Sequence, residues 1–377
     1  MEKKNKNTSK TITVIVVVFI MLLLVIDIVI HYVPLKDIFT QTVITKTEKD
    51  VQITDEGIAE AVDKLYDAAV IVEVGSGDKI NGWGSGFVYK IDGDVAYVLT
   101  NYHVAGDAKT IKIVYTDESE VDGEFVGGSE YMDVAIVKVP ASSVKKVAEI
   151  GSSENLRVGD TVFAVGTPVS LQYSFSVTRG ILSGKERFVA SKSSETNMYG
   201  FSQTKDIWYE RLLQIDATIN SGNSGGALCN SNGEVVGITN SKLSGSTSSS
   251  ASIENMGFAI PIEDALMVAE QVLTTGKYVR PVLGVTMTTF EAAAQNGMTA
   301  PDGVTEGAII DSVTPGGSAA KAGLQRGDIV IKFGDYKIED YLYLKYYVGR
   351  YKVGDKVEVT YIRNGKEQKT TITLQES

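Results

Sequence analysis

A hydrophobic run, TITVIVVVFIMLLLVIDIVI, occupies residues 11–30 and contains one ionisable residue, Asp27, near its outer end. A helix of about 20 apolar residues is long enough to cross a bilayer core of roughly 30 Å. Lysines precede the run, whereas Lys36 and Asp37 nearly cancel after it, so the positive-inside rule places residues 1–10 in the cytoplasm and everything after His31 outside. We expect a transmembrane signal anchor at residues 11–31 and a polar stalk at residues 32–53.

A cleaved signal peptide is the alternative interpretation of this run. Its apolar core would span about 7–15 residues and would end at a cleavage site of small residues. The run is longer than that, and the segment HYVPLKD that follows it contains no such site. The pattern therefore favours an anchor that is retained.

Beyond the stalk, the pattern predicts one helix and then many short strands. Apolar residues at helical spacing begin after Thr54, and from Val70 to about Ile262 short β-rich runs such as AVIVEV, VAYVLTN and DVAIVKV are broken by Gly, Asn and Asp. Many short strands at even spacing are typical of a sandwich or a barrel. Residues 185–210 lack a clean pattern and are expected to form an inserted loop, and the low-complexity residues 241–252 a surface loop.

A helix-like run, EDALMVAEQVLTTG, ends at Gly276, and a second set of strands with Gly-rich turns starts near Val279. A chain of 377 residues is too long for one typical domain. We expect one domain at residues 54–276 and a second, smaller domain at residues 279–377.

Composition narrows the classes of partner and cofactor. The net charge of −11 and the pI near 4.9 argue against a nucleic-acid-binding surface, which needs a basic patch. Cys229 is the single cysteine, so no intrachain disulfide is possible, and its apolar surroundings predict a buried structural thiol. No His/Cys cluster has metal-ligand spacing, so we expect neither a metal nor a cofactor.

The chain has two histidines, and they differ in context. His31 lies at the outer end of the apolar run, whereas His103 lies in the segment LTNYHV, upstream of Asp133 in DVAIV and Ser224 in GNSGG. Histidine, aspartate and serine in this order, each beside a strand-like run, are typical of a chymotrypsin-type serine protease. A serine hydroxyl needs a base to take its proton, and a carboxylate holds that imidazole in one tautomer. We therefore expect His103, Asp133 and Ser224 to form a catalytic triad.

The glycines around Ser224 allow two further inferences. Gly222 can adopt backbone angles that other residues resist, so the N–H groups of Gly222 and Ser224 can converge on an oxyanion. The segment also satisfies G-x-S-x-G, the nucleophile elbow of α/β-hydrolases. That fold places its histidine after the serine, and no histidine follows Ser224, so the esterase interpretation fails.

These motifs closely resemble the HtrA/Deg family of serine proteases over roughly residues 55–377. The motifs that carry the resemblance are GSGFV (84–88), LTNYHV (99–104), DVA (133–135), NSGNSGGAL (220–228) and GFAIP (257–261). Ser221 and Ala227 depart from residues that the family often has there. The resemblance implies a mainly β fold: two six-stranded β-barrels of the chymotrypsin-like fold, followed by an α+β PDZ domain.

The resemblance also assigns roles in the second domain and in substrate binding. It implies that the segment Val282, Leu283, Gly284 and Val285 binds a peptide carboxylate through backbone N–H groups, and that Asp340 to Tyr347 forms the groove helix. It implies that Ile219 helps to shape the S1 pocket, and that the protein is a homotrimer or higher oligomer acting on unfolded or damaged extracytoplasmic polypeptides.

Two functional classes follow from these observations. The first is a membrane-anchored serine endopeptidase for protein quality control, with chaperone activity as an open addition. The second is a binding module with a silent protease fold. A degenerate site would be expected to lose at least one of His103, Asp133, Ser224 or Gly222, and all four are present.

Overall fold

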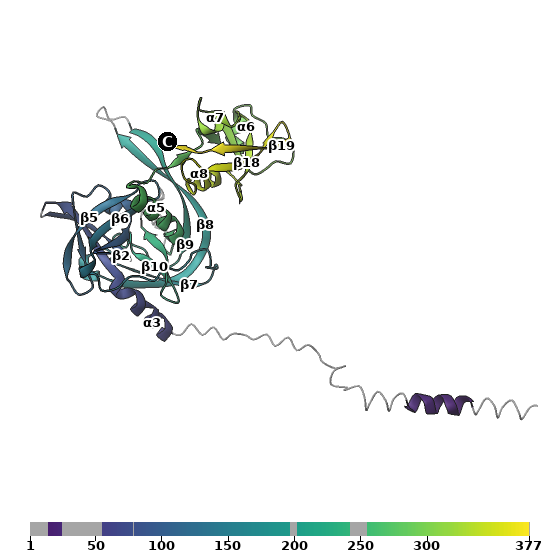
Figure 1. Ribbon diagram of the computed structural model, residues 1–377, viewed down its shortest axis with the longest axis horizontal. Helices are drawn as coiled ribbons and strands as arrows, with labels where there is room; N and C mark the ends of the chain where they lie inside the picture. Colours follow the sequence, from purple (N-terminus) through teal and green to yellow (C-terminus); the bar gives the residue numbers. More distant parts are fainter. Residues whose placement is uncertain (1–13, 25–54, 78, 197–201, 242–254, 377) are drawn as a thin grey trace, which may run out of the picture. The chain divides into compact units, whose positions relative to one another are not determined.

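The computed structural model describes residues 14–24, 55–77, 79–196, 202–241 and 255–376 (Figure 1). The chain divides into two compact units, residues 1–53 and residues 54–377. In the first unit, residues 14–24 are helical. Among the described residues, no helix combines the length and the apolar character that crossing a membrane requires. The rest of the predicted anchor and the predicted stalk lie outside the described residues.

The first barrel follows a short helical lead-in, α3 (Asp55–Leu65) and the 3-10 turn η1 (Tyr66–Ala68). Its strands are β1 (Ala69–Ser76), β2 (Lys79–Asp92), β3 (Val95–Thr100), β4 (Thr110–Val114), β5 (Glu120–Ser129) and β6 (Val134–Pro140). They close in the order β1-β2-β3-β6-β5-β4. In β4 exposed and buried positions alternate, and the buried Ile111 and Ile113 pack inside the barrel with Val72, Val98 and Val137.

The second barrel is also closed and six-stranded, in the order β10-β11-β12-β9-β8-β7. Its strands are β7 (Thr161–Gly166), β8 (Ser176–Thr196), β9 (Ser202–Ile215), β10 (Ala227–Asn230), β11 (Val235–Asn240) and β12 (Gly257–Pro261). Helix α5 (Ile262–Thr275) follows and ends at Gly276, which takes the left-handed conformation with φ 82°. The prediction of two six-stranded barrels is therefore confirmed, and so is the helix that ends at Gly276.

The prediction of an inserted loop at residues 185–210 is wrong. Strands β8 and β9 stay paired past the barrel, from Arg187 opposite Leu212 to Thr196 opposite Ser202, and Figure 1 shows both ribbons continuing beyond it. The ladder forms through backbone groups, so it does not need the apolar alternation that a core-facing strand shows. The sequence of this arm, ERFVASKSSET, therefore gave no strand signal. The predicted loop at residues 241–252 lies, beyond Ser241, outside the described residues.

The C-terminal part is a separate sheet with helices. The sheet order is β14 (Val285–Thr288), β15 (Ala308–Val313), β16 (Ile329–Phe333), β18 (Lys356–Arg363) and β19 (Lys366–Thr373), with β17 (Tyr336–Lys337) paired to β16 and β13 (Pro281–Val282) paired separately to β20 (Gln375–Glu376). The helices are α6 (Phe290–Gln295), α7 (Ser318–Lys321) and α8 (Tyr341–Gly349). Asp340 caps α8 by accepting the backbone N–H of Leu342 at 2.7 Å. Tyr346 and Tyr347 are buried, whereas Tyr341 and Tyr343 are half-buried.

Helices α5 and α8 meet through a buried charged cluster. Asp264 of α5 accepts a hydrogen bond from the Tyr346 hydroxyl at 2.8 Å and from Nη1 of Arg350 at 2.9 Å. The guanidinium of Arg211, from β9, lies 5.1 Å from the centroid of the Tyr346 ring. Burial raises the pKa of Asp264, and Arg211 and Arg350 oppose this effect. This cluster joins the second barrel to the C-terminal domain.

Candidate active site

Barrel topology explains why His103 and Asp133 lie together. Strands β3 and β6 are antiparallel neighbours, and Thr100 at the end of β3 pairs with Ala135 at the start of β6. The short helix α4 (Tyr102–Ala105) starts directly after β3 and carries His103, while Asp133 immediately precedes β6. His103 and Asp133 therefore lie at the same end of this pair of strands.

The contact between His103 and Asp133 is close. Nδ1 of His103 lies 2.7 Å from Oδ2 and 3.0 Å from Oδ1 of Asp133, and the backbone N–H of His103 donates to Oδ1 at 2.9 Å. The aspartate is 2% exposed, whereas the histidine side chain is 23% exposed. The carboxylate of Asp133 can therefore fix the His103 tautomer in which Nδ1 carries the proton and Nε2 is the basic nitrogen.

Two asparagines hold Asp133, which adopts a positive φ of 51°. Nδ2 of Asn101 donates to the Asp133 carbonyl at 2.8 Å, and Nδ2 of Asn240 donates to Oδ2 at 3.1 Å. Neither asparagine was singled out from the sequence. Asn101 lies inside the histidine motif and could have been noticed there, whereas Asn240 ends β11 with no local signal.

Ser224 lies in a tight turn between β9 and β10. The N–H of Asn223 donates to Asn220 O at 3.0 Å and that of Gly226 to Asn223 O at 2.9 Å. The Ser224 carbonyl accepts the N–H of Ser85, from β2 of the other barrel, at 2.8 Å. Hydrogen bonds to both barrels therefore hold the turn, and Ser224 is 3% exposed.

The backbone of this turn suits the binding of an oxyanion. Gly222 has φ 96°, and a Cβ atom there would lie 2.2 Å from the carbonyl oxygen of Thr167, so only glycine fits. The N–H groups of Asn223, Gly225 and Gly226 each donate a hydrogen bond to a backbone carbonyl of the protein. Those of Gly222 and Ser224 have no acceptor among the described residues, and they remain available to a ligand.

The hydroxyl of Ser224 contacts Ser241, which follows β11. The two Oγ atoms are 2.5 Å apart, and the N–H of Ser241 donates to Ser224 Oγ at 3.2 Å. Within the described part of the chain, no hydrogen bond joins Ser224 Oγ to His103. Sequence reasoning did not identify Ser241, which lies at the start of a low-complexity segment.

Ile219, predicted to shape the S1 pocket, is 5% exposed. It packs in an apolar cluster of the second barrel that includes Ala217, Leu228 and Ala259. Its side chain therefore contributes to the barrel core beside the nucleophile turn. Its role in specificity stays a prediction.

The predicted carboxylate-binding segment, Val282 to Val285, turns at Gly284 with φ 71°. Leu283 and Gly284 use their carbonyls to accept the N–H groups of Ala319 and Thr314, both at 2.8 Å. Their own N–H groups have no acceptor in the described ranges. A cavity of about 290 Å³ lies beside the segment, lined by Arg280, Pro281, Val282, Leu283, Gly284, Val285, Met287, Thr314, Lys345 and Val348. Backbone donors beside a pocket match what a peptide carboxylate requires.

Arg280, which precedes this segment, is partly buried. Its guanidinium carbon lies 3.6 Å from the centroid of the Tyr131 ring, which is a cation–π contact. Arg280 therefore packs against Tyr131 and also lines the cavity beside residues 282–285.

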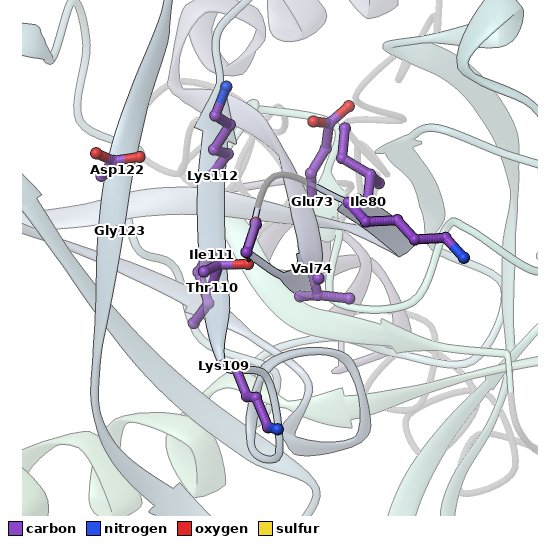
Figure 2. A pocket seen from close by; sticks show the side chains of 12 residues that line it. Glu73, Val74, Ile80, Lys109, Thr110, Ile111, Lys112, Asp122 and Gly123 are labelled. Carbon is purple, nitrogen blue, oxygen red and sulfur yellow. Dashed lines mark hydrogen bonds between the residues drawn. The ribbon is translucent and has the colours of Figure 1, made fainter.

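A second cavity, of about 470 Å³, lies on the first barrel away from the three predicted catalytic residues (Figure 2). Figure 2 shows Glu73 and Val74 of β1 beside Lys109, Thr110, Ile111 and Lys112 at the start of β4. Burial, with the nearby Glu120, raises the pKa of Glu73, and Lys112 opposes the effect. Its lining mixes charges of both signs, with Glu73 and Asp122 beside Lys79, Lys109 and Lys112.

Known proteins resemble this chain over most of its length. Residues 84–238 match the trypsin-like peptidase domain family, and residues 281–374 match the PDZ domain family. The chain is 36% identical over 304 residues to Serine protease Do-like HtrA of Lactococcus lactis subsp. cremoris (strain MG1363), covering 80% of this chain and 72% of that protein. It is 37% identical over 307 residues to the Bacillus subtilis (strain 168) protein of the same name, covering 79% and 65%.

A solved structure gives the same result. The HtrA-type protease AlgW with tripeptide superposes with a TM-score of 0.66 at 28% sequence identity. The superposition covers 85% of this chain and 97% of that one.

Proposed function

The chain belongs to the HtrA family of serine proteases, and we propose that it cleaves unfolded or damaged polypeptides outside the cytoplasm through His103, Asp133 and Ser224. The observation that carries this proposal is the 2.7 Å contact between His103 Nδ1 and Asp133 Oδ2. This contact holds Nδ1–H of the imidazole toward the carboxylate and leaves Nε2 free to accept the proton of a serine nucleophile.

The reaction follows from these groups. Ser224 Oγ attacks the carbonyl carbon of the scissile peptide bond while His103 Nε2 accepts the hydroxyl proton. The carbonyl oxygen becomes an oxyanion, which the N–H groups of Gly222 and Ser224 stabilise. The imidazolium then gives its proton to the leaving amine, and an ester remains on Ser224. A water molecule, deprotonated by His103, hydrolyses this ester and restores the serine.

The C-terminal PDZ domain is proposed to bind peptide C-termini at residues 282–285. The N–H groups of Leu283 and Gly284, which have no acceptor among the described residues, and the adjacent cavity support this assignment. The homotrimer or higher oligomer implied by the resemblance is part of the same proposal. So is the accompanying chaperone activity.

Membrane anchoring through residues 11–31 is proposed from the apolar run and its flanking charges. The proteolytic and PDZ domains would then lie on the extracytoplasmic side of the membrane. Alkaline carbonate extraction of membranes from producing cells tests this: an anchored chain stays with the membrane fraction, and a variant lacking residues 1–31 leaves it. Recovery of the full chain in the soluble fraction would contradict the anchor.

Casein digestion tests the proteolytic assignment. The full chain in detergent, its Ser224→Ala variant and a Ser119→Ala control are each incubated with casein, and fragments are followed by mass spectrometry. Ser119 lies in the exposed turn between β4 and β5, and its hydroxyl donates a hydrogen bond to Asp117. Cleavage by the wild type and the control, but not by Ser224→Ala, supports the proposal. Equal cleavage by Ser224→Ala would overturn it.

A further inference from the structure

The end of strand β11 contacts the predicted catalytic apparatus at three successive residues. The hydroxyl of Thr239 donates to a carbonyl of the nucleophile turn at 2.5 Å, Asn240 donates to the predicted catalytic aspartate, and Ser241 reaches Ser224. Side chains along an extended segment alternate between its two faces, which explains why residues 239 and 241 share a target that residue 240 does not. The position of Ser241 is thus tied to that of the nucleophile.

Ser241 engages the reacting atom itself. Its N–H donates to Ser224 Oγ at 3.2 Å, and its hydroxyl oxygen lies 2.5 Å from the same atom. A serine hydroxyl carries one proton. When Ser224 shares its proton with Ser241, that proton is not directed at His103, and the described residues show no hydrogen bond between Ser224 Oγ and His103.

We propose that Ser241 is a positioning residue that holds the Ser224 hydroxyl in a resting arrangement, turned from His103. The inference rests on the proposed proteolytic function. Attack requires the hydroxyl proton to point at Nε2 of His103. In this arrangement Ser224 donates to Ser241 Oγ, and rotation of the Ser224 side chain exchanges that acceptor for His103, so Ser241 competes with His103 for the same proton.

The size of the effect follows from that competition. The net free energy of an ordinary hydrogen bond changes the ratio of two side-chain conformations by about three- to tenfold. Removing the Ser241 hydroxyl should therefore raise the rate of the first attack by that factor. Deacylation should not change, because the Ser224 oxygen then carries the acyl group and has no proton to share.

A small covalent reagent measures the first attack directly. Diisopropyl fluorophosphate reacts with an activated serine: a bond forms between Ser224 Oγ and phosphorus, fluoride leaves, and the hydroxyl proton passes to His103. The full chain in detergent is labelled between pH 6 and 9, and the adduct on Ser224 is quantified by peptide mass spectrometry. The variants are Ser241→Ala, Ser241→Val and Ser241→Thr, with Ser119→Ala as the control.

We expect Ser241→Ala and Ser241→Val to be labelled about three to ten times faster than the wild type at every pH. Ser241→Thr keeps the hydroxyl in a side chain of the same shape as valine and should be labelled at the wild-type rate. A loss of packing would affect threonine and valine alike, so this pair separates the hydroxyl from its volume. Ester substrates should show faster acylation with an unchanged deacylation rate.

Equal or slower labelling of both Ser241→Ala and Ser241→Val would overturn the inference while leaving the protease assignment intact. So would a threonine variant that behaves like the valine variant, or an adduct on Ser241 in the wild type. If neither the wild type nor any variant is labelled at Ser224, the proposed function fails and the inference fails with it.

Discussion

Asn240 donates a hydrogen bond to Oδ2 of Asp133 at 3.1 Å, and so joins the second barrel to the predicted aspartate of the first. The same oxygen lies 2.7 Å from His103 Nδ1. The carboxylate is therefore held from one side by the base that it orients and from the other by an amide on β11. Orientation of the histidine depends on both barrels.

The first prediction concerns this amide. Asn240→Ala removes a donor from a buried carboxylate and lets it rotate, so we expect kcat to fall about tenfold with little change in KM. Steady-state hydrolysis of a peptide substrate measures both constants. Asn232→Ala, in an exposed turn, is the matched control and should match the wild type. An unchanged kcat in Asn240→Ala would show that the other contacts of Asp133, with His103 and Asn101, are enough to hold the aspartate.

The second prediction concerns the oxyanion site. In Gly222→Ala, the new Cβ would lie 2.2 Å from Thr167 O at φ 96°, so the turn must move and its N–H groups lose their aim. Loss of one oxyanion donor costs on the order of 100- to 1,000-fold in kcat. Gly82→Ala is the control, since its Cβ would meet Val74 at an ordinary 3.8 Å. Activity near the wild-type level in Gly222→Ala would contradict the assignment.

The third prediction concerns the cluster between α5 and α8. Arg350→Met removes a charged hydrogen-bond donor from the buried carboxylate of Asp264, which should cost about 2 kcal/mol of stability at pH 7. Calorimetry of the variant should show an earlier unfolding transition. Lys356→Met, on an exposed position of β18, should unfold like the wild type.

The same variant has a defined pH dependence. Arg350 lowers the pKa of Asp264, so its removal raises that pKa further above the ordinary value of 3.8. The folded state then takes up a proton before the unfolded state does, and stability rises as the pH falls through the folded pKa. The deficit relative to the wild type should therefore shrink between pH 7 and about pH 4. A deficit that grows on acidification would contradict the role of Asp264.

The fourth prediction concerns Cys229. The thiol is fully buried among core residues that include Phe163 and Val235, and burial raises its pKa well above the usual value. Reaction with a thiol reagent therefore requires opening of the barrel. Dithiobis-nitrobenzoate should label one thiol per chain in denaturant and should label the native protein on the order of 1,000 times more slowly. Rapid stoichiometric labelling of the native protein would contradict this.

The arm formed by β8 and β9 shows where local pattern stops being informative. In β4, one face is buried, so the sequence TIKIV alternates and its strand is readable. Beyond the barrel, β8 and β9 stay paired from Arg187 opposite Leu212 to Thr196 opposite Ser202, although the sequence there resembles that of a loop. A strand shows alternating apolar and polar residues in the sequence only where one of its faces is buried.

Sequence alone determined most of the short strands, the helix that ends at Gly276 and the identity of the candidate catalytic residues. Hydrophobic periodicity reports which faces are buried, and a turn such as GNSGG requires glycine for local steric reasons. Only the tertiary structure decided which side chains meet. The pairing of β3 with β6 brings His103 to Asp133, and the end of β11 brings Asn240 and Ser241 to groups more than a dozen positions away. Closure of the two barrels sets these contacts, and no local pattern encodes them.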